Sequence, residues 1–353
     1  MTSISFISIL FSIFPLLIVN TFIFIPIFGD GLFQEELSAS MAGRDLSLLI
    51  KMSPPVVTTD TLKGGQTPLI QFRLSDTATN ETLKHVTYLI EIEKSEKRLL
   101  LDTFHSHTGN LGIQMRPSSA DHITINGDQD TILLSYTGDM EHPVSATGPI
   151  FAEGGLYHFI VTIETLDFDR TFIPTDSQPV YEGWLSVGYS IDKDLEINGT
   201  DYTIDAISYY DTLNNFNYDS MDNELNFSMP FDWSLDRLKK VNLYVHEEIT
   251  IPNPSPLAAN GYEGTVNNID LSPNLLMVDR TNSTKDVVHF MLTKPVVLDL
   301  AQKVADNSKN NQNMTNEMTF TLSPSKNAVN PGSMIGPNSM NMSMNNGSGG
   351  GGM

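Results

Sequence analysis

The chain has 353 residues, 40% of them apolar, and it carries 42 acidic against 20 basic side chains, a formal net charge of −22. This length and apolar content suffice for two domains with packed cores, whereas such a negative surface repels phosphate groups, so we expect no nucleic-acid partner. The sequence contains no cysteine, which excludes disulfides, thiolate metal ligands and cysteine nucleophiles.

An almost wholly apolar segment occupies residues 4–28, and the first charged residue is Asp30. About 20 apolar residues span a bilayer, whereas the apolar core of a signal peptide usually has about 7–15 residues. We therefore expect residues 1–30 to form a helix that is either a signal peptide or a transmembrane anchor. The membrane would then be a partner, and the rest of the chain would be exported. Small residues at 38–40 (Ser-Ala-Ser) offer a cleavage site.

Seven Asn-x-Ser/Thr sequons also favour export, because this tripeptide is the acceptor for N-glycosylation. The candidates are Asn80, Asn198, Asn226, Asn282 and Asn313, with two more at Asn341 and Asn346. As a set they indicate a glycoprotein that is anchored on the membrane or lies in an extracellular or pseudo-periplasmic space.

Short strands separated by turns predict a first β-sandwich over residues 42–168. Apolar residues alternate with other residues from Val86 to Ile92, a period of two. Further strands are expected at 68–74, 99–107, 123–125 and 157–163. Tyr157, in Gly-Leu-Tyr-His-Phe, resembles the tyrosine corner of immunoglobulin-like sandwiches, and we interpret it as a fold marker.

After a linker at residues 169–183, a second sandwich is expected at 184–303. Its strands are predicted at 184–189, 200–209, 224–228, 241–251, 264–269, 275–278 and 287–292, with a helical turn at 236–240. From residue 304 to 353 asparagine, serine, methionine and glycine dominate, and this composition favours a disordered tail. The expected fold is therefore all-β, with two immunoglobulin- or fibronectin-III-like sandwiches.

The clearest candidate ligands are His105 and His107, which lie two residues apart on a predicted strand and so share one face. Imidazoles in this arrangement can chelate Cu(II) or Zn(II). The third ligand would be His158, His122 or His142. The alternative is that both histidines only form hydrogen bonds, because Leu99 and Leu101 would share their face and could make it a core face.

A second candidate for copper is the run Met340, Met342 and Met344, because thioethers are soft ligands that suit Cu(I). The alternative is a low-complexity spacer.

Calcium is a weaker candidate cofactor, suggested by three Asp-x-Asp pairs that also suit ordinary turns. These pairs are Asp128/Asp130, Asp167/Asp169 and Asp192/Asp194.

Four segments resemble exported proteins of ammonia-oxidising archaea (Thaumarchaeota). They are Leu-Leu-Asp-Thr-Phe-His-Ser-His-Thr-Gly-Asn-Leu at 100–111, Gly-Pro-Ile-Phe-Ala-Glu-Gly-Gly-Leu-Tyr-His-Phe at 148–159, Ser-Met-Pro-Phe-Asp-Trp at 228–233 and Val-His-Glu-Glu-Ile-Thr-Ile-Pro at 245–252. The resemblance covers roughly residues 45–300. It implies a surface protein from organisms that depend on copper enzymes, and it implies no activity.

Enzyme motifs are missing from the sequence. There is no Gly-x-Ser-x-Gly, and His246-Glu247-Glu248 lacks the second histidine of a zinc-protease helix. Glu247 and Glu248 should point to opposite faces of a strand and cannot act as a pair. We expect a non-catalytic surface or envelope-associated binding or structural protein with envelope partners. The alternative is a copper-handling protein that uses the His pair and the Met-rich tail. A hydrolase whose carboxylates meet from distant segments is a third possibility.

Overall fold

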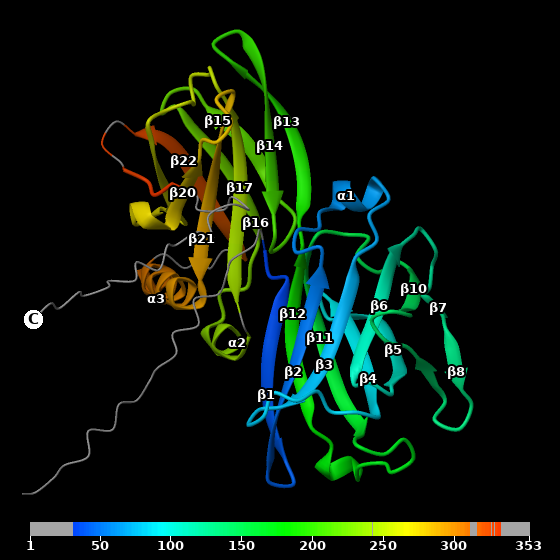
Figure 1. Cartoon of the computed structure of the whole chain (residues 1–353). Helices are drawn as coiled ribbons and strands as arrows, with labels where there is room; N and C mark the ends of the chain where they lie inside the picture. The colour runs from blue at the N-terminus through cyan, green and yellow to red at the C-terminus, as the bar shows by residue number, and fades with distance from the viewer. Residues whose placement is uncertain (1–30, 242, 311–315, 326, 328, 333–353) are drawn as a thin grey trace, which may run out of the picture.

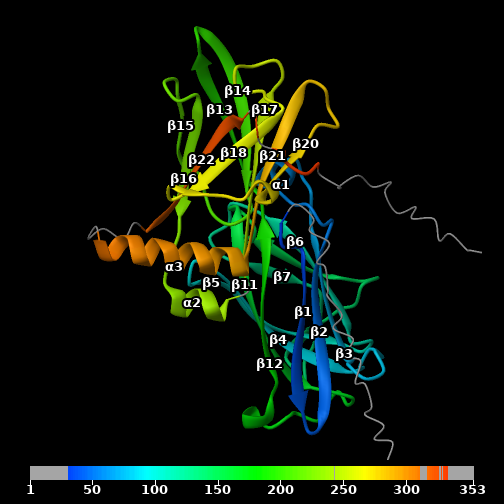
Figure 2. The ribbon, with the colours of Figure 1, turned by 90° about the vertical axis from the view of Figure 1, so that its left-hand side faces the viewer.

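The computed structural model describes residues 31–332 except 242, 311–315, 326 and 328 (Figure 1). Most of the regular structure in this part of the chain is β-strand, which confirms the predicted all-β class. The strands form four sheets, which pack in pairs as two sandwiches, one above the other in both views (Figures 1 and 2). The expected N-terminal helix, Asn313 and the methionine run at 340–344 lie outside the described residues. Within them, no helix has the length and apolarity needed to cross a membrane.

The first sandwich consists of two six-stranded sheets around one apolar core. One sheet contains, in spatial order, β1 (Gln34–Met41), β2 (Arg44–Ser53), β3 (Leu69–Asp76), β6 (Asn110–Pro117), β10 (Val144–Gly148) and β7 (Thr124–Asn126). The other contains β12 (Val180–Val187), β11 (Gly155–Thr165), β4 (Val86–Lys94), β5 (Lys97–Ser106), β9 (Ser135–Thr137) and β8 (Asp128–Asp130). The short helix α1 (Thr59–Lys63) connects β2 with β3, and a single 3-10 turn, η1 (Thr175–Ser177), interrupts the connection from β11 to β12.

The second sandwich consists of two five-stranded sheets with a core of their own. One contains β13 (Tyr189–Ile197), β14 (Thr200–Ser208), β17 (Tyr244–Pro252), β21 (Lys285–Thr293) and β20 (Leu276–Asp279). The other contains β15 (Asn214–Asp219), β16 (Glu224–Pro230), β22 (Glu317–Ser325), β18 (Gly261–Val266) and β19 (Ile269–Asp270). The helices α2 (Leu235–Lys240) and α3 (Lys294–Asn310) contact each other, and η2 (Pro273–Leu275) precedes β20.

Alternating burial is the physical basis of these strands. In β11 every second side chain, from Tyr157 to Ile163, is buried, and the residues between them are half-buried. The alternation predicted for β4 also reflects burial of every second side chain, since Tyr88 and Ile90 are fully buried. The hydroxyl of Tyr157 donates to the carbonyl oxygen of Glu153, four residues upstream, at 2.7 Å.

The first sandwich begins earlier and ends later than residues 42 and 168. β1 pairs with β2 along its whole length, and it contains the expected cleavage site at 38–40. β12 pairs with β11 from Val180 to Val187, so residues 180–183 are not linker and residues 184–187 do not belong to the second sandwich. The two prolines, Pro174 and Pro179, led to the linker prediction, but they precede a strand that pairs with β11, the strand just before it in the chain.

The second sandwich extends into the expected tail. α3 continues to Asn310, and β22 lies between β16 and β18 in the middle of a sheet. Met318, Phe320 and Leu322 alternate as buried residues along β22. This period-two signal is short, and the surrounding asparagines conceal it.

The two sandwiches meet where β12 leads directly into β13. Gly188 lies at this point, and a Cβ atom built on it would come within 2.9 Å of the Tyr209 ring. The backbone N–H of Leu156, in the first sandwich, donates to the carbonyl oxygen of Tyr210, in the second, at 3.1 Å. The junction is therefore a close backbone contact as well as a covalent connection.

Candidate metal centre

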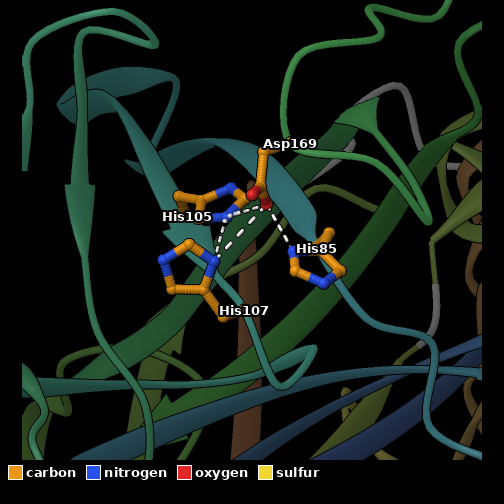
Figure 3. A group of neighbouring side chains, drawn as sticks. All are labelled: His85, His105, His107 and Asp169. Carbon is orange, nitrogen blue, oxygen red and sulfur yellow. Dashed lines mark hydrogen bonds and ion pairs between the residues drawn. The ribbon is translucent and has the colours of Figure 1, made fainter.

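Three histidines and one aspartate of the first sandwich point toward a common centre (Figure 3). His85 immediately precedes β4, His105 lies in β5, and His107 lies in the turn after β5. Asp169 belongs to the loop that follows β11. One potential ligand atom from each residue lies within 4.8 Å of the corresponding atom of every other.

The Asp169 carboxylate is at the middle of the group. Its Oδ1 atom lies 2.5 Å from Nδ1 of His85, 3.1 Å from Nε2 of His105 and 3.4 Å from Nδ1 of His107. The last two nitrogens are 3.3 Å apart. Three imidazole nitrogens and one carboxylate oxygen thus form a compact donor set.

Strand register brings these residues together. His105 pairs with Thr87 across β4 and β5, and Thr87 pairs with Thr165 across β4 and β11. These three residues therefore form one row across the sheet, next to the point where β11 ends and its loop begins. The backbone N–H of His85 donates to the carbonyl oxygen of His107 at 3.2 Å, which closes the end of the β4–β5 pair.

The loop that carries Asp169 is held on both sides. Its Asp167 N–H donates to the carbonyl oxygen of Lys84 at 2.9 Å. The Asp167 carboxylate accepts from the Arg44 guanidinium at 2.8 Å, and Arg44 also pairs with Asp76. These contacts tie the loop to the start of β4 and to the opposite sheet.

One arrangement of protons satisfies a chain of hydrogen bonds that ends at His105. In it the Thr165 hydroxyl donates to the carbonyl oxygen of His85, at 3.1 Å. The Thr87 hydroxyl, 2.6 Å away, then donates to Thr165 and accepts from Nδ1 of His105 at 2.9 Å. This arrangement places the proton of neutral His105 on Nδ1 and leaves the lone pair of Nε2 pointing at the centre.

The charge states also suit ligands. Burial lowers the pKa of His105, and the neighbouring His107 lowers it further, so this imidazole is neutral at pH 7. Burial acts to raise the pKa of Asp169, but the hydrogen bond from His85 and the three nearby imidazoles bring it below its usual value. His105 is fully buried, whereas the side chain of His107 is 56% exposed.

The structure brings together the predicted pair His105 and His107, and it separates the three candidates for a third ligand. His158 lies at the far end of β11, stacked on Trp184 with ring centroids 4.5 Å apart. His122 and His142 are exposed, and among the described residues they do not belong to this group of potential ligands.

The sequence suggests that the face of β5 that carries Leu99, Leu101 and His105 could be a core face, but in the structure this face is directed outward. Leu101 is 45% exposed, whereas Leu100 and Phe104 point into the core. His105 is buried on this outer face because the chain around it, including the Asp169 loop, covers it.

Sequence reasoning missed His85 and the role of Asp169. The sequence places Asp169 in an expected linker and in an Asp-x-Asp pair that suggests calcium, and neither feature predicts a site shared with histidines. The other two pairs behave as surface residues: Asp130 accepts backbone N–H groups of the turn after β8, and Asp194 accepts from Thr203.

Four of the glycosylation candidates lie in described parts of the chain. Asn80, Asn198 and Asn282 are exposed, and Asn226 is half-buried in β16.

Comparison of the chain with known protein families and with curated proteins finds no match in either case.

Proposed function

We propose that this protein is an exported, non-catalytic metal-binding protein that holds one copper or zinc ion between His85, His105, His107 and Asp169. The observation that carries the proposal is the orientation of His105. Its Nε2 lone pair faces the Asp169 carboxylate at 3.1 Å, and two acceptors at that distance repel each other unless a cation or a proton lies between them. In the proton arrangement that satisfies the threonine chain the proton is on the other nitrogen, and a metal ion then satisfies both groups.

The donor set favours a transition metal. Neutral imidazoles suit zinc and copper, whereas calcium prefers a shell made of oxygens. In a tetrahedral site with metal–nitrogen bonds of about 2.0–2.1 Å, ligand atoms are about 3.3–3.4 Å apart. The separations of 3.1, 3.3 and 3.4 Å that His105, His107 and Asp169 show are close to this value. The 2.5 Å between Nδ1 of His85 and Oδ1 of Asp169 is a hydrogen-bond distance, which must lengthen before His85 becomes the fourth ligand.

A binding role fits this site better than catalysis does. The four potential ligands are enough to fill a tetrahedral shell once His85 turns from Asp169 to the ion, whereas catalytic zinc sites keep one position open for water or substrate. Neither of two surface pockets in the described part of the chain, of about 740 and 280 Å³, is lined by a residue of the metal centre.

Export is supported by the apolar segment at residues 4–28 and by the exposed sequons Asn80, Asn198 and Asn282. An immunoglobulin-like identity of the first sandwich is supported by the Tyr157 corner. The resemblance to exported archaeal proteins supports a location on the cell surface, with envelope proteins as partners. The methionine run at 340–344 stays a prediction, which Cu(I) retention by a chain lacking residues 338–353 would test.

Metal analysis tests the proposed site. The full-length protein, purified in mild detergent, is loaded with Zn(II) or Cu(II), dialysed and analysed for bound metal. The variant His107→Ala/Asp169→Asn alters two partly exposed side chains and should retain one ion per chain fewer than the wild type. The matched control His122→Ala/His142→Ala removes two exposed histidines outside the site and should retain as much as the wild type. Equal retention by the two variants, with unchanged circular dichroism, would refute the site.

A further inference from the structure

A second group of potential ligands lies in the other sandwich. His246 and Glu248 come from β17 and His289 from the neighbouring strand β21. Glu248 pairs directly with His289 across the two strands, and His246 lies two residues from Glu248 on the same face. As with His105 and His107, two of the potential ligands lie two residues apart in the chain. The third comes from the neighbouring strand.

Three ligand atoms converge in this group. Nε2 of His246 lies 3.1 Å from Nδ1 of His289. The Glu248 Oε1 atom lies 3.7 Å from the first nitrogen and 3.9 Å from the second. Those two distances are too long for hydrogen bonds, yet all three atoms lie within 4.8 Å of one another. The spacing suits three ligands of one ion, for which about 3.3–3.4 Å is expected in a tetrahedral shell.

The group is much less exposed than the first one. The side chains of His246, His289 and Glu248 are 2%, 8% and 12% exposed. The Tyr209 ring stacks on His246 with centroids 5.1 Å apart. Tyr209 also approaches Gly188 at the junction of the sandwiches, which places the group beside that junction.

Both imidazoles are in the form that binds metals. Burial lowers the pKa of His246 to about 3, assisted by the nearby His289. Burial also lowers the pKa of His289. A cation at this position is stabilised, because it meets two neutral imidazoles and a carboxylate that has little contact with water.

The adjacent Glu247 does not belong to this group. As expected for consecutive strand residues, it points to the opposite face, where it is fully buried and accepts from the Ser208 hydroxyl at 3.1 Å. Burial raises its pKa well above the usual value. Glu247 is therefore a natural control for Glu248, because the two carboxyl groups are neighbours on one strand.

We propose that His246, Glu248 and His289 form a second metal site, which holds a zinc or copper ion that exchanges with solvent more slowly than the ion in the first sandwich. The reason for slow exchange is access: the three ligands are nearly covered, whereas His107 in the first site is 56% exposed. The alternative is a single hydrogen bond between His246 and His289 with no ion.

The test uses the full-length protein that carries His107→Ala/Asp169→Asn, so that the first site does not contribute. After loading with Zn(II) and dialysis, this protein should retain one ion per chain, and loss of that ion to excess chelator should be slow. Adding Glu248→Gln should speed the loss at least about tenfold, because loss of a second-shell group alone costs about 10–100-fold in metal affinity. Adding Glu247→Gln should leave the rate unchanged.

Two results would overturn the second site: no retained ion in the first-site variant, or equal loss rates for the Gln variants at positions 247 and 248. Neither result tests the first site. That site is tested by the number of ions lost when His107→Ala/Asp169→Asn is introduced into the wild type. Because the ligands are buried, His289→Gln is measured as well, with thermal unfolding as a check on folding. A folded His289→Gln protein that keeps its ion as long as its parent would also overturn the second site.

Discussion

Replacing Thr87 by valine tests whether the hydroxyl chain prepares His105 for a metal ion. Valine keeps the shape of threonine but removes the hydroxyl that lies 2.9 Å from His105 Nδ1. Both residues are fully buried, so no water replaces the lost acceptor. The Nδ1–H group would be left unpaired, at a cost of about 1–3 kcal/mol.

The imidazole can avoid this cost by moving its proton to Nε2, where Asp169 lies 3.1 Å away as an acceptor. In that tautomer the lone pair is on Nδ1, which points away from the metal centre. Metal binding then requires the unfavourable tautomer again, and the same 1–3 kcal/mol corresponds to a loss of about 5- to 150-fold in affinity. This range includes the 10–100-fold loss that is usual when a second-shell group is removed.

The assay is competition for Zn(II) with a chelator of known affinity, measured for the wild type and for Thr87→Val. Thr87→Ser keeps the hydroxyl and should bind nearly as the wild type does. Thr162→Val changes a half-buried threonine of β11 and serves as the matched control. An affinity loss below about twofold in folded Thr87→Val would refute the role of the tautomer.

The remaining predictions concern the fold around the site. Phe320→Ala should lower the free energy of unfolding by about 3–5 kcal/mol in urea titrations, because Phe320 is 1% exposed in β22; a change below 1 kcal/mol would contradict a core role for this segment. Gly109→Ala should lower both thermal stability and metal retention, since Gly109 has φ +72° and a Cβ atom there would lie 1.5 Å from the Leu83 carbonyl oxygen; an unchanged melting temperature would argue against this turn. Hydrogen bonds from the backbone of Thr79 and then Ala78, with the charge of Arg44, lower the pKa of Asp76. The stabilisation by ionised Asp76 is therefore present above its ordinary value of 3.8 and lost as pH falls through the lowered value. Asp76→Asn should be less stable than the wild type at pH 7, and the gap should close in acid; a gap independent of pH would contradict the assignment.

Part of the metal centre follows from local rules. The i, i+2 rule alone places His105 and His107 on one side of their strand, and it would have done the same for His246 and Glu248. It says nothing about His85, which is 20 positions before His105 and meets it only because β4 and β5 pair in one register. Asp169 is further still along the chain, and it reaches the site because β11 pairs with β4.

The sequence by itself determined the all-β class and most of the strands. These features depend on the alternation of side chains along a single strand, which is a local property. Only the tertiary structure decided which strands are neighbours, so only it could extend the sandwiches to β1, β12 and β22. The same long-range pairing assembled the two ligand groups. Pairing depends on contacts between residues far apart in the chain, and a register shift of one residue would turn every side chain of a strand to the other face.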